Sequence, residues 1–305
     1  MSDILVVGSL NADLVVRAPR FPQPGETISG HDLQVIPGGK GANQAVAASR
    51  LGANVSMLGR VGRDNFGDFL LNNLKSNKVD NQLVQRDDAS TGTATIIVDA
   101  NGQNSIVLSA GANGKVTSAD VEHASFLDFK LLLLQLEITT PTVLHAAQRA
   151  KENGVTIILN PAPAKEIPDK LIALADFIIP NETELSLLTG MEVTDISSTE
   201  RAARKLFERG AINVIVTLGS KGVLIVDKNR SRQVDTYKVD VVDTTAAGDA
   251  FIGGFAVGLI QGKSIEDTTK FGCACGALAT TKFGAQPSLA TKEEVERFMS
   301  LRGEL

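Results

Sequence analysis

The chain has 305 residues, 43% hydrophobic and 21% charged, with a formal net charge of −5 at pH 7, which predicts a globular protein with a large core and excludes a disordered chain. A nucleic-acid-binding site needs a basic surface or stacking aromatic rings. The negative net charge, the single Tyr and the lack of Trp therefore disfavour nucleic acid as a partner. No apolar run reaches the ~20 residues of a membrane span and no secretory signal is evident, so we expect a cytoplasmic protein with no membrane partner.

Short apolar runs alternate with helical patterns along the chain. The runs typical of strands buried on both faces are residues 4–8, 55–59, 131–136, 156–159, 177–180 and 214–218. Helical patterns between them include residues 41–51, 142–153 and 199–209. This order predicts an α/β fold, with a doubly wound and mainly parallel sheet flanked by helices.

Two β-rich segments without helices interrupt this rhythm. One contains Phe21-Pro22-Gln23-Pro24-Gly25, and in the other Asn101-Gly102 is typical of a hairpin turn. We expect them to form a small β-sheet lid over the strand ends, or alternatively an extension of the sheet edge. The predicted domains are a catalytic α/β domain of residues 1–12, 37–92 and 109–305, and a β lid of residues 13–36 and 93–108.

The first candidate binding segment, Gly8-Ser9-Leu10-Asn11-Ala12-Asp13, follows the first predicted strand. Open α/β sheets bind ligands at such strand ends. Asn11 and Asp13 are two residues apart in extended chain, so their side chains share one face and can converge on neighbouring hydroxyls of a polyol. The alternative is a turn in which both side chains bond local backbone.

The second candidate segment is Pro37-Gly38-Gly39-Lys40-Gly41-Ala42-Asn43-Gln44-Ala45. Its glycines permit close backbone approach before a helix that carries Asn43 inward, where sugar hydroxyls can be bound. A Gly-rich entry into an ordinary helix explains the glycines but not Lys40 and Asn43. The segment lacks the third glycine of a dinucleotide-binding motif, which disfavours a hydride-transfer enzyme.

The third candidate segment is Asp243-Thr244-Thr245-Ala246-Ala247-Gly248-Asp249-Ala250-Phe251. Three small residues before a predicted helix let backbone N–H groups converge on a phosphate, and Asp249 can accept a proton beside them. This combination indicates phosphoryl transfer to an alcohol, against the alternative of an Asp in the first turn of an ordinary helix. Close to the helix N-terminus, Asp249 is expected to keep a low pKa.

Two further predictions concern isolated polar residues. Cys273 and Cys275 lie two apart in a predicted helix and point in different directions, so we expect small core residues and no disulfide. Glu137 follows a buried strand, where an unpaired carboxylate is costly, so it needs either a polar ligand or a helix N-terminus to cap.

Seven short segments stand in a distinctive order, at residues 8–13, 38–45, 159–164, 180–184, 217–222, 243–251 and 284–288. These segments resemble those of the PfkB family of sugar kinases, and the resemblance extends over essentially the whole chain. The lysine-containing loop and residues 284–288 are most similar to members that phosphorylate ribose. The resemblance implies ATP-dependent phosphorylation of D-ribose at O5, giving D-ribose 5-phosphate and ADP.

The resemblance also implies roles for individual residues. Asp249 would take the proton of the ribose O5 hydroxyl, while backbone donors of Ala246, Ala247 and Gly248 hold the transferred phosphate. Residues implied to bind the sugar hydroxyls are Asn11, Asp13, Gly39, Lys40, Asn43 and Glu137. Residues implied to line the ATP site are Asn181, Glu184, Thr217, Gly219, Ser220, Lys221, Gly222, Gly248 and Cys273.

Cations and a partner chain are implied in the same way. Glu184 would help to organise Mg²⁺ and phosphate. A K⁺ site, partly of backbone carbonyls, would involve Asp243, Thr245, Ala279, Lys282, Gly284 and Ser288. Cys273 stands where the family often has His or Asn, so a side-chain hydrogen bond to ATP is expected to be weakened. The lid would pair two chains into a homodimer.

The alternatives to ribose phosphorylation are a kinase for another sugar or a nucleoside, and a non-catalytic sugar-binding regulator.

Overall fold

The large sheet of the protein has nine strands. The structure is a computed structural model that describes residues 3–304. In sheet order the strands are β13 (Ser231–Val234), β12 (Val223–Val226), β11 (Val214–Thr217), β10 (Phe177–Ile178), β9 (Thr156–Leu159), β8 (Leu131–Leu134), β1 (Ile4–Val7), β4 (Val55–Gly62) and β5 (Asp80–Asp87). All pairs from β11 to β5 are parallel, and the β11–β12 and β12–β13 pairs are antiparallel. The predicted mainly parallel sheet is confirmed.

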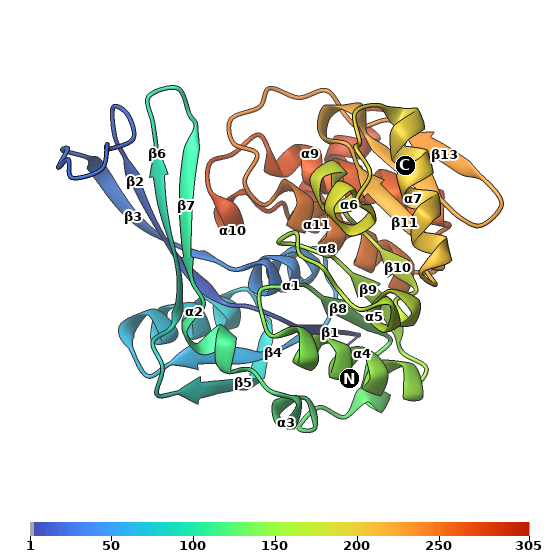
Figure 1. Cartoon of the computed structure of the whole chain (residues 1–305), viewed down its shortest axis with the longest axis horizontal. Helices are drawn as coiled ribbons and strands as arrows, with labels where there is room; N and C mark the ends of the chain where they lie inside the picture. Colours follow the sequence, from blue (N-terminus) through green and yellow to red (C-terminus); the bar gives the residue numbers. More distant parts are fainter. Residues whose placement is uncertain (1–2, 305) are drawn as a thin grey trace.

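Helices cover both faces of this sheet (Figure 1). One face carries α1 (Lys40–Arg50), α2 (Asn65–Ser76), α8 (Ala247–Ile260), α9 (Ile265–Ala279) and α11 (Lys292–Ser300). The other face carries α3 (Ser118–Val121), α4 (Thr140–Glu152), α5 (Asp169–Leu174), α6 (Glu182–Thr189) and α7 (Ile196–Glu208). Strand β1 shows why two cores form, because Ile4 and Val6 are buried in one and Leu5 and Val7 in the other. The doubly wound arrangement is therefore confirmed.

A second, four-stranded sheet stands beside the large one, at the left of Figure 1. Its order is β3 (His31–Gly38), β2 (Asn11–Arg17), β6 (Gly92–Val98) and β7 (Asn104–Ser109). The predicted hairpin lies between β6 and β7, where Gly102 has a φ of 77° and its N–H donates to the Asp99 carbonyl. The strands begin slightly before the predicted lid segments, at Asn11 and Gly92. That this sheet closes over a ligand stays a prediction.

Local features of the chain agree with the predicted core. Cys273 and Cys275 are buried and unbonded to each other, as predicted, and both belong to the apolar core beneath α8 and α9. Within residues 3–304, no helix is long and apolar enough to cross a membrane.

Candidate active site

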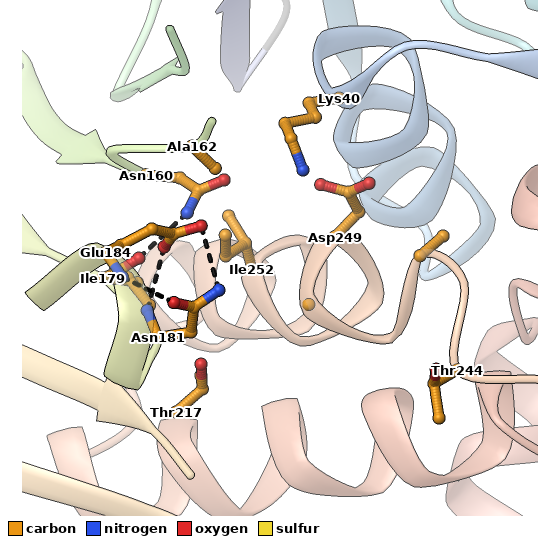
Figure 2. A pocket seen from close by; sticks show the side chains of 12 residues that line it. Lys40, Asn160, Ala162, Ile179, Asn181, Glu184, Thr217, Thr244, Asp249 and Ile252 are labelled. Atoms are coloured by element: carbon orange, nitrogen blue, oxygen red, sulfur yellow. Dashed lines mark hydrogen bonds between the residues drawn. The ribbon is translucent and has the colours of Figure 1, made fainter. Parts of the chain in front are cut away.

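Asp249 lies where α1 and α8 meet the carboxyl ends of the central strands. It is the third residue of α8 and is 6% exposed. Its two carboxylate oxygens accept hydrogen bonds from different amides: Asn43 Nδ2 donates to Oδ2 (2.9 Å) and Gln44 Nε2 donates to Oδ1 (3.0 Å). Figure 2 shows the Lys40 ammonium pointing toward the same carboxylate. One base, one cation and two amides therefore gather at a single buried point.

The environment of Asp249 corrects the expectation of a low pKa. Burial raises the pKa of Asp249 above its usual value, with the nearby Glu137 acting in the same direction. Lys40 and the hydrogen bonds from Asn43 and Gln44 oppose this increase without cancelling it. The low pKa was expected from the helix N-terminus, whereas the loss of water around the buried carboxylate has the larger effect. A raised pKa makes the ionised Asp249 carboxylate a stronger base but lowers the fraction that is ionised at a given pH.

The turn before α8 leads into the helix N-terminus at which the phosphate is predicted to bind. Gly248, in the first turn of α8, lines the cavities on both sides of the turn, and a Cβ built on it would meet no atom within 4 Å. First-turn amides have no acceptor within the helix and can bind phosphate. The Ala247 N–H instead donates to the Thr244 carbonyl (3.2 Å). Its predicted contact with phosphate would need that bond to open.

Ala246 has the left-handed backbone conformation, with φ 60° and ψ 9°. This conformation costs an L-residue with a Cβ about 1–2 kcal/mol, and glycine adopts it freely. Since glycine also loses more backbone entropy on folding, we expect Ala246→Gly to raise the free energy of unfolding by about 0.5–1 kcal/mol, measured by urea denaturation. Ala247→Gly, at the first residue of α8, is the matched control and should lower it. A less stable Ala246→Gly variant would contradict the strain argument.

Asn11 and Asp13 are brought to the same buried region, at the start of β2. They are 5% and 9% exposed, and Asn113 Nδ2 donates to Asn11 Oδ1 (2.7 Å). Burial, aided by repulsion from Glu137 and Asp249 and opposed by Lys40, raises the pKa of Asp13 to about 7. A Cβ at Gly38 would lie 2.1 Å from Asp13 Oδ2, so glycine is needed there.

The Gly39–Lys40 backbone joins this region to α1. Gly39 has a φ of 87°, and a Cβ there would lie 2.7 Å from the Asn11 nitrogen, so the glycine serves close packing of the loop on β2. Glu137 accepts hydrogen bonds from the Ser9 hydroxyl and from the Lys40 backbone N–H (3.0 Å). Of the two partners expected for Glu137, the structure shows the helix N-terminus. Its predicted contact with a sugar remains untested.

A cavity of about 740 Å³ lies on the other side of the turn that precedes α8. The predicted ATP residues that line it are Asn181, Thr217, Gly219, Ser220, Gly222, Gly248 and Cys273. Lys221 does not line it, and its ammonium bonds Glu182 (3.2 Å). Burial raises the pKa of Cys273 to about 12, so this wall presents a neutral thiol.

A smaller cavity of about 210 Å³ is lined by Asp249 and shares part of its wall with the larger one. Both are lined by Asn181, Thr217 and Gly248, and the smaller one also by Lys40 and Glu184 (Figure 2). The shared residues place the larger cavity next to the one that contains Asp249. This adjacency is the main chemical feature of the site.

Glu184 and Asn181 bond each other at the start of α6. The Glu184 N–H donates to Asn181 Oδ1 (2.8 Å), and the Asn181 N–H donates to Glu184 Oε2 (2.9 Å). No group of three or more His, Cys, Asp or Glu in residues 3–304 is arranged to hold a metal. Glu184 offers carboxylate oxygens of the kind that Mg²⁺ binds, and its contact with Mg²⁺ stays a prediction.

Asp243 connects two parts of the predicted K⁺ site. Its Oδ1 accepts bonds from the N–H (2.9 Å) and hydroxyl (2.6 Å) of Thr245, and its Oδ2 accepts one from the Gly284 N–H (2.9 Å). Although burial raises the pKa of Asp243, these bonds hold it below its usual value. The Lys282 ammonium is itself a cation and bonds Glu294 (2.7 Å), so only the Lys282 backbone carbonyl is a candidate ligand for K⁺. The Ser288 hydroxyl donates to the Ala285 carbonyl (2.7 Å), and Ala279 ends α9. Carboxylate and carbonyl oxygens suit a hard cation.

Several residues of the site were not predicted from the sequence. Gln44 contacts Asp249 directly, Asn160 and Thr244 line the smaller cavity, and Tyr237 lines the larger one. Gln44 follows Asn43 in a predicted binding helix, and Asn160 directly follows a buried strand. These two positions could have identified Gln44 and Asn160 from the sequence. Tyr237 lies in a segment without regular structure, and no sequence pattern indicated it.

Comparison with known proteins places this site in a family. The model for "pfkB family carbohydrate kinase" matches residues 1–292. The chain belongs to the pfkB family of carbohydrate kinases. This pfkB member is 43% identical over 299 residues to a ribokinase of Haemophilus influenzae, covering 97% of this chain and 98% of that one. It is also 39% identical over 303 residues to a deoxyribokinase of Salmonella typhi, covering 98% and 99%.

A solved structure has the same fold as this pfkB kinase. Arabidopsis thaliana ribokinase, complexed with ribose and ATP, superposes with a TM-score of 0.91 at 35% identity, and the match covers 98% of each chain. Both the sequence and the architecture of the chain are thus those of a carbohydrate kinase.

Proposed function

We propose that the protein is a ribokinase, which transfers the γ-phosphate of ATP to O5 of D-ribose and releases D-ribose 5-phosphate and ADP. The observation that carries this proposal is Asp249, which lies buried between the residues implied to bind sugar and the cavity implied to bind nucleotide. The relatives named ribokinase and the ribose and ATP complex of the plant enzyme support the choice of substrates.

Asn43 supports a sugar at this point. Its Nδ2 donates to Asp249, while its buried Oδ1 has no hydrogen-bond partner within residues 3–304. An unsatisfied buried acceptor is costly, and a sugar hydroxyl is a donor that can satisfy it. In the same region the Asp13 carboxylate can accept hydrogen bonds and the Lys40 ammonium can donate them, which suits a polyol with several hydroxyls.

The chemistry follows from the arrangement around Asp249. As O5 bonds to phosphorus, Asp249 takes the hydroxyl proton, and first-turn amides of α8 hold the oxygens of the transferred phosphate. Phosphoryl transfer has a loose transition state, so positioning and charge stabilisation dominate catalysis. Mg²⁺ beside Glu184 would neutralise phosphate charge, and K⁺ near Asp243 would fix the turn that leads into α8.

Deoxyribose is the second candidate substrate, because a deoxyribokinase is also 39% identical to the chain. The two sugars differ by one hydroxyl, and a site built to bind that hydroxyl rejects the analogue that lacks it. The site offers more polar groups than a deoxysugar, with its one hydroxyl fewer, can use. These groups belong to Asn11, Asp13, Lys40 and Asn43, and they favour ribose.

Coupled ADP release tests the proposal over ribose, deoxyribose, fructose, fructose 6-phosphate and adenosine, each with and without K⁺. We expect the highest kcat/KM for ribose and a clear increase with K⁺. Higher kcat/KM with another acceptor would contradict the ribose assignment. Ribose binding without turnover on any acceptor would support a sugar-binding regulator instead.

The small sheet is proposed to act as a lid and to pair two chains in a cytoplasmic homodimer. Its apolar side chains Leu33, Ile106 and Val107 are 69%, 50% and 69% exposed, and a partner of the same kind would cover them. Sedimentation at micromolar concentration should give twice the chain mass, and a monomer would contradict the pairing. Cell fractionation tests the location.

A further inference from the structure

We infer that Gln44 is a positioning residue that holds the Asp249 carboxylate in its reactive orientation, and that Gln135 fixes Gln44 from behind. This inference rests on the proposed function, because it concerns how the base of that reaction is held. None of the functional roles implied by the sequence includes either glutamine.

Gln44 is fully buried and its amide is completely bonded. Its Nε2 donates to Asp249 Oδ1 (3.0 Å) and to Asn160 Oδ1 (3.2 Å), which occupies both amide hydrogens. Asn160 is itself fixed, since its Nδ2 donates to the Ile179 carbonyl (3.0 Å) at the end of the neighbouring strand. The amide that contacts the base is therefore attached to the sheet as well as to α1.

Gln135 sets which end of the Gln44 amide faces Asp249. Its Nε2 donates to Gln44 Oε1 (2.6 Å), so the Gln44 oxygen points away from the carboxylate and the nitrogen toward it. The reverse orientation would place two acceptors together in a buried site. Gln135 is 0% exposed and directly follows β8.

Gly8 provides the space that Gln135 occupies. A Cβ at Gly8 would lie 2.1 Å from Gln135 Oε1, which has no hydrogen-bond partner within residues 3–304. An unpaired buried acceptor is costly. The absence of a Cβ at Gly8 therefore leaves the Gln135 amide in the position from which it bonds Gln44.

Neutral amides suit this position because charges already surround the base. Lys40 of α1 attracts the Asp249 carboxylate, whereas Asp13 of β2, Glu137 after β8 and Glu184 of α6 repel it. With the Gln44 donor removed, one carboxylate oxygen loses its partner, so the group can rotate and is harder to ionise. Both changes reduce the fraction of Asp249 that is ionised and aimed at the acceptor hydroxyl.

The test compares kcat, KM and the pH dependence of kcat in Gln44→Met, Gln135→Met and the wild type. For Gln44→Met we expect kcat to fall about tenfold to a hundredfold, with ribose KM within about threefold. The acidic limb of the kcat profile should move to higher pH, since the base ionises later. Gln135→Met should also lower kcat and move the acidic limb to higher pH, but both changes should be smaller than in Gln44→Met.

Thr199→Val is the matched control. It removes a buried side-chain hydrogen bond, from the Thr199 hydroxyl to the Asp195 carbonyl (2.7 Å), in α7 away from the site. It should lower stability and leave the pH profile unchanged. Both glutamine variants are checked for cooperative thermal unfolding before kinetics.

An unchanged kcat profile in folded Gln44→Met and Gln135→Met would overturn the inference, even if the wild type phosphorylates ribose. Equal shifts in the Thr199→Val control would overturn it too. Failure of the wild type to phosphorylate any sugar would instead reject the proposed function, so the two failures are distinguishable.

Discussion

Asp249→Asn should lower kcat for ribose phosphorylation by about a thousandfold or more, while ribose still binds within about tenfold of the wild-type affinity. The substitution keeps the shape of the side chain and removes its ability to accept the hydroxyl proton. Binding is preserved because Asn11, Asp13 and Lys40 remain. Single-turnover kinetics and calorimetric titration with ribose separate these effects. Near-normal turnover would reject Asp249 as the base.

The same variant should be more stable than the wild type at high pH. Because the pKa of Asp249 is raised in the folded state, ionising it costs free energy that the unfolded chain does not lose. The penalty is absent at pH values below the unfolded pKa and grows as pH rises toward the folded pKa. Asp249→Asn should therefore unfold at a higher temperature at pH 8, with a gap that narrows toward pH 4. A variant that loses activity and stability together at pH 8 would contradict this.

Asp13→Asn should lower kcat/KM for ribose by about a hundredfold, mainly through KM. The buried Asp13 carboxylate is proposed to accept hydrogen bonds from sugar hydroxyls, and an amide can accept only through one atom. Since the pKa of Asp13 is raised to about 7, the wild-type kcat/KM should rise with pH through that value. The part of the rise that belongs to Asp13 should be lost in the variant, whereas the acidic limb set by Asp249 should remain. A pH profile that Asp13→Asn leaves unchanged would show that another group controls it.

The raised pKa of Asp13 also predicts the direction in which Asp13→Asn changes stability. Its pKa rises from 3.8 to about 7 in the folded state, so ionisation opposes folding increasingly between these values. Removing the charge should stabilise the protein above pH 7 by up to about 4 kcal/mol, from 1.36 kcal/mol for each pKa unit. Asp32→Asn, on an exposed part of β3, is the control and should change neither stability nor kinetics. Denaturant unfolding at pH 5 and pH 8 measures the difference.

Much of the fold was predictable because buried parallel strands leave a clear mark in the sequence. Runs such as Leu131–Leu134 are apolar on both faces, and each was assigned as a strand. Strands at the sheet edges were missed for a physical reason. β5 contains Asp80, Arg86 and Asp87, because half-exposed edge strands tolerate charge and lack such a run. The β12 and β13 hairpin was missed as well, although β12 is an apolar and mostly buried run between β11 and β13.

The candidate site was only partly predictable, because short motifs show which residues are present but not how they are enclosed. Asp249 and Asn43 were found from the small residues around them. The raised pKa of Asp249 depends on its burial and on Glu137, which is distant in the sequence, and no local pattern reports either. Gln44 and Gln135 are 91 residues apart in the sequence and make one hydrogen bond in the fold. Such pairs appear only when the chain is folded.

A crystal structure of the protein with ribose and a non-hydrolysable ATP analogue tests the central claim most directly. We predict that ribose O5 lies within hydrogen-bond distance of the Asp249 carboxylate, with the terminal phosphate against the first-turn amides of α8. A sugar whose O5 faces away from Asp249, or a nucleotide whose phosphates end elsewhere, would contradict the assignment of Asp249 as the base for phosphoryl transfer.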